Sequence, residues 1–199
     1  MSDARALAES ARRKADESTR VVRAFVDDHA DAFARCAADV AARFEKGARL
    51  FAIGNGGSAC DAQHLAVEFM HPILEKRRAL PAVALTTDAA LLSAVANDHD
   101  FAFVFADQLR ALARDGDIVL GISTSGDSPS VVRAFELARS IGVLTIGFAG
   151  RDGGRMTSVA DHLFVVPSYS IHRIQEAHGV ALHLLWDLVQ VSLGAEDVL

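Results

Sequence analysis

The sequence predicts an α/β fold, a three-layer sandwich in which helices cover both faces of a five-stranded parallel sheet. Five short apolar runs follow residue 49, and stretches with helical spacing separate them. Each of the first three runs stops at glycine, threonine or serine. The chain has 199 residues, of which 51% are hydrophobic, enough to bury the core of one compact domain over residues 1–199.

The first region, residues 2–46, has the spacing of helix and no glycine until Gly47, which is a plausible residue to end it. We predict two segments that meet near Asp27–His29. Their apolar stripes comprise Val21, Val22, Phe25 and Val26, then Phe33, Ala37, Val40 and Phe44.

The α/β pattern fills residues 47–199. The predicted strands are Leu50–Ile53, Ala82–Leu85, Ile118–Ile122, Val143–Phe148 and Leu163–Val166. The predicted helices are 58–70, 88–96, 101–113, 128–140, 153–158 and 172–193. The long amphipathic helices at the two ends of the chain predict helix-to-helix packing between subunits, with residues 1–46 serving this purpose.

Composition excludes several classes of protein. The net charge of −6 argues against a general partner of nucleic acid or of a membrane surface. No apolar stretch reaches the length of a membrane span, and no signal peptide precedes the helices, so we expect a cytoplasmic protein. Cys36 and Cys60 are too few for a disulfide framework, and both are expected to be small buried residues.

The first strand stops at a glycine loop, Gly54–Ser58. Gly56 and Gly57 allow a ligand to approach the backbone, and the helix that follows points its positive end at the same place. Asn55 and Ser58 add hydrogen-bonding side chains. A dinucleotide site is the alternative, but its acidic residue is expected about 20 positions later, whereas the candidate Asp88 lies 34 positions after Gly54.

The third strand stops at a hydroxyl loop, Ser123–Ser128. Ser123, Thr124, Ser125 and Ser128 bring hydroxyls to the start of a helix, where a phosphate dianion is favoured. The alternative is a helix cap, for which one such residue is enough. Because the loop has no Lys or Arg and no Walker A spacing, a small phosphorylated metabolite fits better than a nucleoside triphosphate.

Candidate acid–base and metal residues lie on two helices. His64 and Glu68 are four apart, so they share one helix face and could relay a proton, ligate a metal or form an ordinary surface pair. Gln175 and His183 lie about 12 Å apart along the last helix, and they bind one metal only if the glutamine folds towards it. His178 lies between them. Asp98 could bind sugar hydroxyls or cap the helix near Phe101.

These residues resemble the phosphoheptose isomerase family of the SIS-domain class, whose fold is flavodoxin-like. The matching segments are GNGGSACDAQHLAVEF (54–69), PAVALTTD (81–88), AVANDHDF (94–101), GDIVLGISTSGDSPSVVRAF (116–135) and RIQEAHGVALH (173–183). The resemblance implies isomerisation of sedoheptulose 7-phosphate to D-glycero-D-manno-heptose 7-phosphate through an enediol, a step towards lipopolysaccharide heptose precursors. It also implies a homotetramer with active sites at subunit boundaries.

The resemblance assigns roles to residues of this chain. Glu68 and His183 correspond to the acid–base pair, and Asp98 lies near the sugar chain. One Zn²⁺ per subunit is implied, with ligands corresponding to His64, Glu68, Gln175 and His183. The residues expected to bind substrate are Asn55, Gly56, Gly57, Ser58, Asp98, Ser123, Thr124, Ser125, Ser128 and Gln175.

Two positions depart from the family pattern. Pro72 stands where many members have an arginine, with Lys76, Arg77 and Arg78 as replacements by a different route, and His172 stands where some have aspartate. Two other functions therefore remain open. One is a non-catalytic SIS module that binds a sugar phosphate or a protein partner. The other is an isomerase of a different ketose phosphate.

Overall fold

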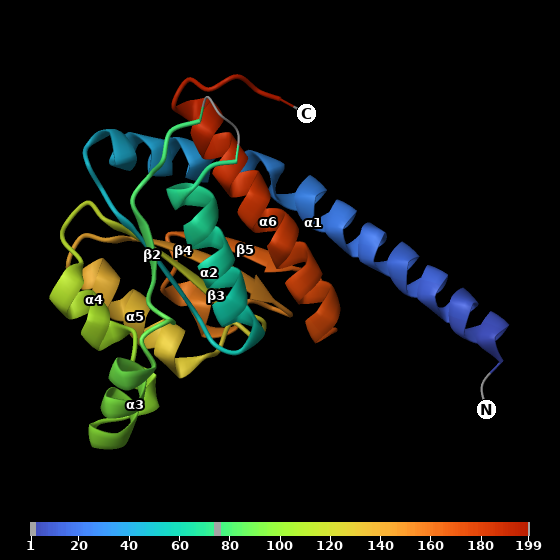
Figure 1. The fold of residues 1–199 in the computed structure, drawn as a ribbon, viewed down its shortest axis with the longest axis horizontal. Helices are drawn as coiled ribbons and strands as arrows, with labels where there is room; N and C mark the ends of the chain where they lie inside the picture. Colours follow the sequence, from blue (N-terminus) through green and yellow to red (C-terminus); the bar gives the residue numbers. More distant parts are fainter. Residues whose placement is uncertain (1–2, 74–76, 199) are drawn as a thin grey trace.

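A computed structural model describes residues 3–73 and 77–198, and it confirms the predicted α/β architecture (Figure 1). Five parallel strands form one sheet in the order β2-β1-β3-β4-β5. The strands are β1 (Leu50–Gly54), β2 (Ala82–Ala84), β3 (Ile118–Ser123), β4 (Leu144–Gly150) and β5 (His162–Val166). The helices are α1 (Ala4–Glu45), α2 (Gly57–Met70), α3 (Ala89–Asp98), α4 (Ala106–Leu112), α5 (Pro129–Ser140) and α6 (Ile171–Ser192).

The sheet divides the buried side chains into two cores because successive residues of a strand point to opposite faces. Leu50 and Ala52 of β1 pack into the core under α1, α2 and α6, whereas Phe51 and Ile53 pack into the core under α4 and α5. Every residue of β1, β3 and β4 is buried. Near-continuous apolar runs therefore mark strands covered on both faces, as the sequence indicated.

Helix α1 corrects one prediction, because residues 4–45 form a single helix with no break near Asp27–His29. No glycine or proline interrupts it, and aspartate costs a helix only a fraction of what those residues cost. Arg23 pairs with Asp27 at 2.7 Å along the helix, and His29 Nδ1 contacts the carbonyl of Phe25 at 3.0 Å. Gly47, with φ of 86°, follows the helix as predicted.

The predicted helix over 101–113 is also only partly correct. It consists of a 3₁₀ turn, η1 (Phe101–Phe103), and the short helix α4, while 153–158 is a second 3₁₀ segment, η2 (Gly154–Ser158). Asp100, not Asp98, caps η1, since its carboxylate accepts the N–H of Ala102 at 2.8 Å. The capping alternative for Asp98 is therefore wrong, and Asp98 is the exposed last residue of α3.

The two cysteines differ in burial. Cys36 is fully buried, and burial raises the pKa of its thiol. Cys60 is exposed on α2, which contradicts the expectation that both are buried, because its position faces away from the core residues Ala62 and Leu65. Among the described helices, none combines the length and apolar composition of a membrane span.

Candidate active site

The two sequence loops lie side by side because β1 and β3 are neighbours in a parallel sheet. Gly54, at the end of β1, is in register with Ile122 of β3, so the glycine loop and the hydroxyl loop emerge at the same edge. From β1, the chain adds β2 on one side of the sheet and then β3, β4 and β5 on the other. Ligands of open α/β sheets bind at such a switch point.

In the glycine loop, the backbone turns directly into helix α2. The amide of Asn55 donates to Ser130 Oγ on α5 at 2.9 Å, which ties this loop to the helix that follows the hydroxyl loop. Gly57 is the first residue of α2, and a side chain there would overlap the amide of Gln175 on α6. Sequence reasoning missed Ser130, which is buried, because a serine inside a helix has no distinctive signal.

The hydroxyl loop gathers its side chains around Ser123. Ser123 Oγ donates to Ser128 Oγ at 3.0 Å and lies 3.4 Å from Ser125 Oγ. Ser128 occupies the N-cap position of α5, yet its side chain makes no capping hydrogen bond there. The hydroxyls therefore bond to one another at the start of a twelve-residue helix, whose positive end favours an anion.

A neighbouring turn holds this loop in place. Gly126 has φ of 70°, and a side chain there would overlap the backbone of Gly153. The N–H of Met156 donates to the carbonyl of Gly126 at 3.0 Å, and the N–H of Arg155 donates to Asp127 Oδ1 at 2.9 Å. Asp127 therefore supports the loop from outside and is not a ligand-binding group in this arrangement.

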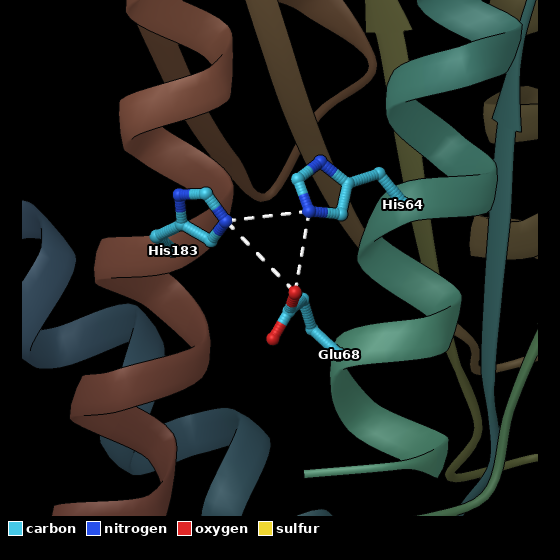
Figure 2. Close-up of side chains that lie close together, drawn as sticks. All are labelled: His64, Glu68 and His183. Atoms are coloured by element: carbon cyan, nitrogen blue, oxygen red, sulfur yellow. Dashed lines mark hydrogen bonds and ion pairs between the residues drawn. The ribbon is translucent and has the colours of Figure 1, made fainter. Parts of the chain in front are cut away.

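His64, Glu68 and His183 form a compact cluster between α2 and α6 (Figure 2). His64 Nε2 lies 3.2 Å from Glu68 Oε1 and 3.3 Å from His183 Nε2, while His183 Nε2 lies 4.0 Å from Glu68 Oε1. Residue 183 is 119 positions from residue 64, so only the packing of α6 beside α2 brings them together. All three facing atoms are able to donate lone pairs to one cation.

The cluster fits a zinc ion. Two histidines and a glutamate form one of the donor sets of catalytic zinc, whose ligands lie about 2.0–2.2 Å from the metal in tetrahedral geometry. Ligand atoms in such a site are therefore about 3.3 Å apart, close to two of the three separations here. The fourth expected ligand, Gln175, lies with its amide against Gly57, at the start of α2.

Two acidic residues lie outside the cluster. Asp61, three residues before His64, has one carboxylate oxygen that is buried without a partner among the described residues. Burial raises the pKa of Asp61, and the charge of His64 opposes that rise. Asp88 caps α3 through the N–H of Leu91 at 2.9 Å, so it does not act as the acidic residue of a dinucleotide site.

Of the residues predicted to replace the missing family arginine, Arg77 is engaged elsewhere in the fold. Arg77 is almost fully buried, where it pairs with Asp187 at 2.6 Å and lies over the ring of Trp186 at 4.7 Å from its centroid. Its guanidinium therefore binds residues near the C-terminal end of α6 and is not available to a substrate. Arg78 is exposed, and its carbonyl accepts from Gln190 at 2.9 Å. Lys76 lies outside the described residues.

His178 is fully buried, and its Nε2 lies 3.1 Å from the carbonyl of Ala149. Burial lowers its pKa to about 4, although the hydrogen bond to Ala149 opposes the shift. The neutral ring therefore donates from Nε2 and serves the packing of α6 on β4. This residue is not part of the metal cluster.

We expect the buried neutral ring of His178 to make the protein less stable in acid. The unfolded chain binds a proton near pH 6.5 and the folded chain only near pH 4. The stability is complete above pH 6.5 and falls by about 3 kcal/mol as the pH drops towards 4. His178→Gln keeps a donor for Ala149 but does not titrate. Urea unfolding at pH 7, 5.5 and 4.5 should show a shallower loss for this variant, and equal losses would contradict the assignment.

Comparisons with known proteins find relatives that match most of this chain. The model of the SIS domain family matches residues 15–150. A phosphoheptose isomerase from Desulfovibrio desulfuricans is 49% identical over 179 residues, 90% of this chain and 85% of the relative. Solved phosphoheptose isomerases from Neisseria gonorrhoeae and Francisella tularensis superpose with TM-scores of 0.87 and 0.88. Their identities are 36% and 32%; the matches cover 93% and 92% of this chain, and 99% and 97% of theirs.

Proposed function

This chain belongs to the SIS-domain family and, within it, to the phosphoheptose isomerases, and from that membership we propose that its His64–Glu68–His183 cluster isomerises a sugar phosphate. The enzyme is an aldose–ketose isomerase that interconverts sedoheptulose 7-phosphate and D-glycero-D-manno-heptose 7-phosphate. The observation that carries the residue assignment is the convergence of a carboxylate and two imidazoles at one point between α2 and α6.

Glu68 is the base in this proposal. Its Oε1 faces both imidazoles, whereas its other oxygen points away from them, as Figure 2 shows. One carboxylate can therefore serve two roles, with Oε1 facing the metal position and Oε2 taking a proton from C1 of the ketose and returning it to C2. The enediol holds the electron pair between the two transfers.

His183 is the second catalytic residue in this proposal. We assign His183 to the transfer of a proton between the oxygens on C1 and C2 through Nδ1, since Nε2 faces the cluster and would hold the metal. Zinc held by His64, Glu68 and His183 would polarise the carbonyl oxygen of the substrate. Gln175, beside Gly57, contributes hydrogen bonds to the sugar in this scheme.

The hydroxyl loop anchors the other end of the substrate. Ser123, Thr124, Ser125 and Ser128 surround the start of α5, and Asn55, Gly56, Gly57 and Ser58 line the facing loop. His64 lies seven residues after Gly57, about 10 Å along α2. The phosphate and the carbonyl of one extended sugar can therefore occupy the two sites together, with Asp98 near the chain of the sugar.

Isotope exchange tests the proposed function. Incubation with sedoheptulose 7-phosphate in deuterated water should place deuterium at C2 of the aldose and at C1 of the recovered ketose, detected by NMR. A non-catalytic module would bind the sugar phosphate, measured by calorimetry, without exchange. A panel of shorter ketose phosphates, with and without a chelator, distinguishes the heptose enzyme from an isomerase of another ketose phosphate.

We also propose that the chain acts as a cytoplasmic homotetramer. The first half of α1 extends away from the sheet, as Figure 1 shows, and almost all of its residues before Phe25 are exposed in one subunit. Packing of this segment against other subunits would cover it and would complete a site that is open on its outer side. A particle of 21.2 kDa in gel filtration would contradict the tetramer.

A further inference from the structure

Arg151 has an unusual backbone conformation at the edge of the sheet that carries the active site. Its φ of 59° makes it the one non-glycine residue with positive φ in the described part of the chain. The N–H of Gly153 donates to the carbonyl of Gly150 at 3.0 Å, so Arg151 is the second residue of a tight turn. Turns with positive φ at that position favour glycine, asparagine or aspartate, and arginine there is strained.

The turn lies directly beside the hydroxyl loop. Ala149 of β4 is in register with Ser123 of β3, so Arg151 follows its strand at the edge where the loop begins. Gly153 packs so closely on Gly126 that a side chain at Gly126 would overlap the Gly153 backbone. The N–H of Arg151 also donates to the carbonyl of Ser168 at 3.0 Å, which fixes the strained residue from its other side.

The side chain of Arg151 is free to bind a ligand. It is exposed, and no hydrogen bond or ion pair within residues 3–73 and 77–198 involves its guanidinium. Its neighbour Arg155 differs, since it donates to the carbonyl of Asp127 at 2.6 Å and supports the loop. Within the described residues of one subunit, no contact of the Arg151 side chain therefore offsets the strain in its backbone.

The hydroxyl loop lacks a positive charge. Its own residues offer hydroxyls and N–H groups, and the guanidinium of Arg155, which contacts the loop, already bonds to the carbonyl and the carboxylate of Asp127. A phosphate ester is a dianion, and hydrogen bonds from a guanidinium to phosphate are about twice as strong as those from neutral donors. An arginine held at the adjacent turn, where glycine would relieve the strain, supplies the missing charge.

We propose that Arg151 binds the phosphate of the substrate and so determines specificity for phosphorylated sugars. The guanidinium reaches over the Ser123–Ser128 loop and pairs with the phosphate oxygens, while the strained turn fixes the point from which it extends. This inference rests on the proposed isomerase function, because it assigns the phosphate end of the same substrate.

Arg151→Gly tests the proposal, because glycine suits positive φ and removes only the side chain. We expect KM for sedoheptulose 7-phosphate, and the Kd for inorganic phosphate from calorimetry, to rise about 10- to 100-fold, the effect of losing one charge-assisted contact. Turnover at saturation should stay within about threefold, and the melting temperature should be equal to or above that of the parent. Arg151→Lys should restore part of the affinity.

The control is Arg133→Ala, which removes an exposed arginine paired with Glu136 on α5 and should leave KM unchanged. Unchanged KM and unchanged phosphate affinity in Arg151→Gly would overturn the proposal, as would a loss of turnover without a change in KM. A parent protein that exchanges no deuterium would instead refute the isomerase function. The phosphate titration of parent and variant still decides the role of Arg151 in that case.

Discussion

Glu68→Gln should lower turnover of sedoheptulose 7-phosphate by at least about 10²- to 10⁴-fold, the usual contribution of a positioned acid–base group. Glutamine has the shape of glutamate but cannot take a proton from carbon. Because Glu68 is largely buried beside His64, the amide should keep its place and the fold should be unchanged. The measurement combines steady-state turnover, deuterium incorporation by NMR and zinc content per subunit.

The matched control is Glu136→Gln, an exposed glutamate on α5 that pairs with Arg133 at 2.9 Å. It changes the net charge by the same amount and should have the turnover of the parent. Addition of zinc in excess distinguishes loss of the base from loss of the metal, since only the second is rescued. Near-normal turnover in Glu68→Gln would remove this residue from the role of base.

His183→Gln should produce the second large effect, with turnover reduced by about 10²-fold or more and bound zinc falling below one per subunit. The substitution removes the imidazole that lies 3.3 Å from His64 Nε2, and with it both a metal ligand and the proposed proton carrier. Elemental analysis of the purified protein gives the zinc content, and thermal unfolding verifies that α6 remains packed.

His162→Gln is the control for this variant. His162 pairs with Asp39 at 2.8 Å, and it lies at the start of the edge strand β5, outside the cluster. Its substitution should leave zinc content and turnover as in the parent. If His183→Gln retained full zinc and full activity, the convergence between α2 and α6 would be structural, and the assignment of the active site would fail.

Local patterns determined the sheet and the loops. The strands are runs of three to seven mostly apolar residues, and this signal is local, so strand positions were predicted to within about two residues. The glycine and hydroxyl loops were also predictable. Gly56, Gly57 and the serines at the end of β3 offer backbone N–H groups and hydroxyls at the start of a helix, a pattern that predicts an anion site.

Competition between weak signals explains the errors. Asp27 and Asp28 suggested a break in α1, but i,i+4 contacts and the absence of glycine keep the helix continuous. Cys60 was expected to be buried by residue type alone, whereas its position on α2 exposes it. Arg77 was predicted as one possible replacement for the family arginine. Its burial against Trp186 and Asp187 depends on tertiary packing, which the local sequence does not indicate.

The sequence by itself determined the fold class, the family and the chemistry of each candidate residue, because strands, turns and donor types are properties of neighbouring residues. Tertiary structure alone decided that His183 meets His64 across 119 positions, that Gln175 lies against Gly57, and that Arg151 is strained beside the hydroxyl loop. These facts depend on how α6 packs on α2 and how β4 ends beside β3. Such packing sums many small contacts between distant segments, and no short stretch of sequence records it.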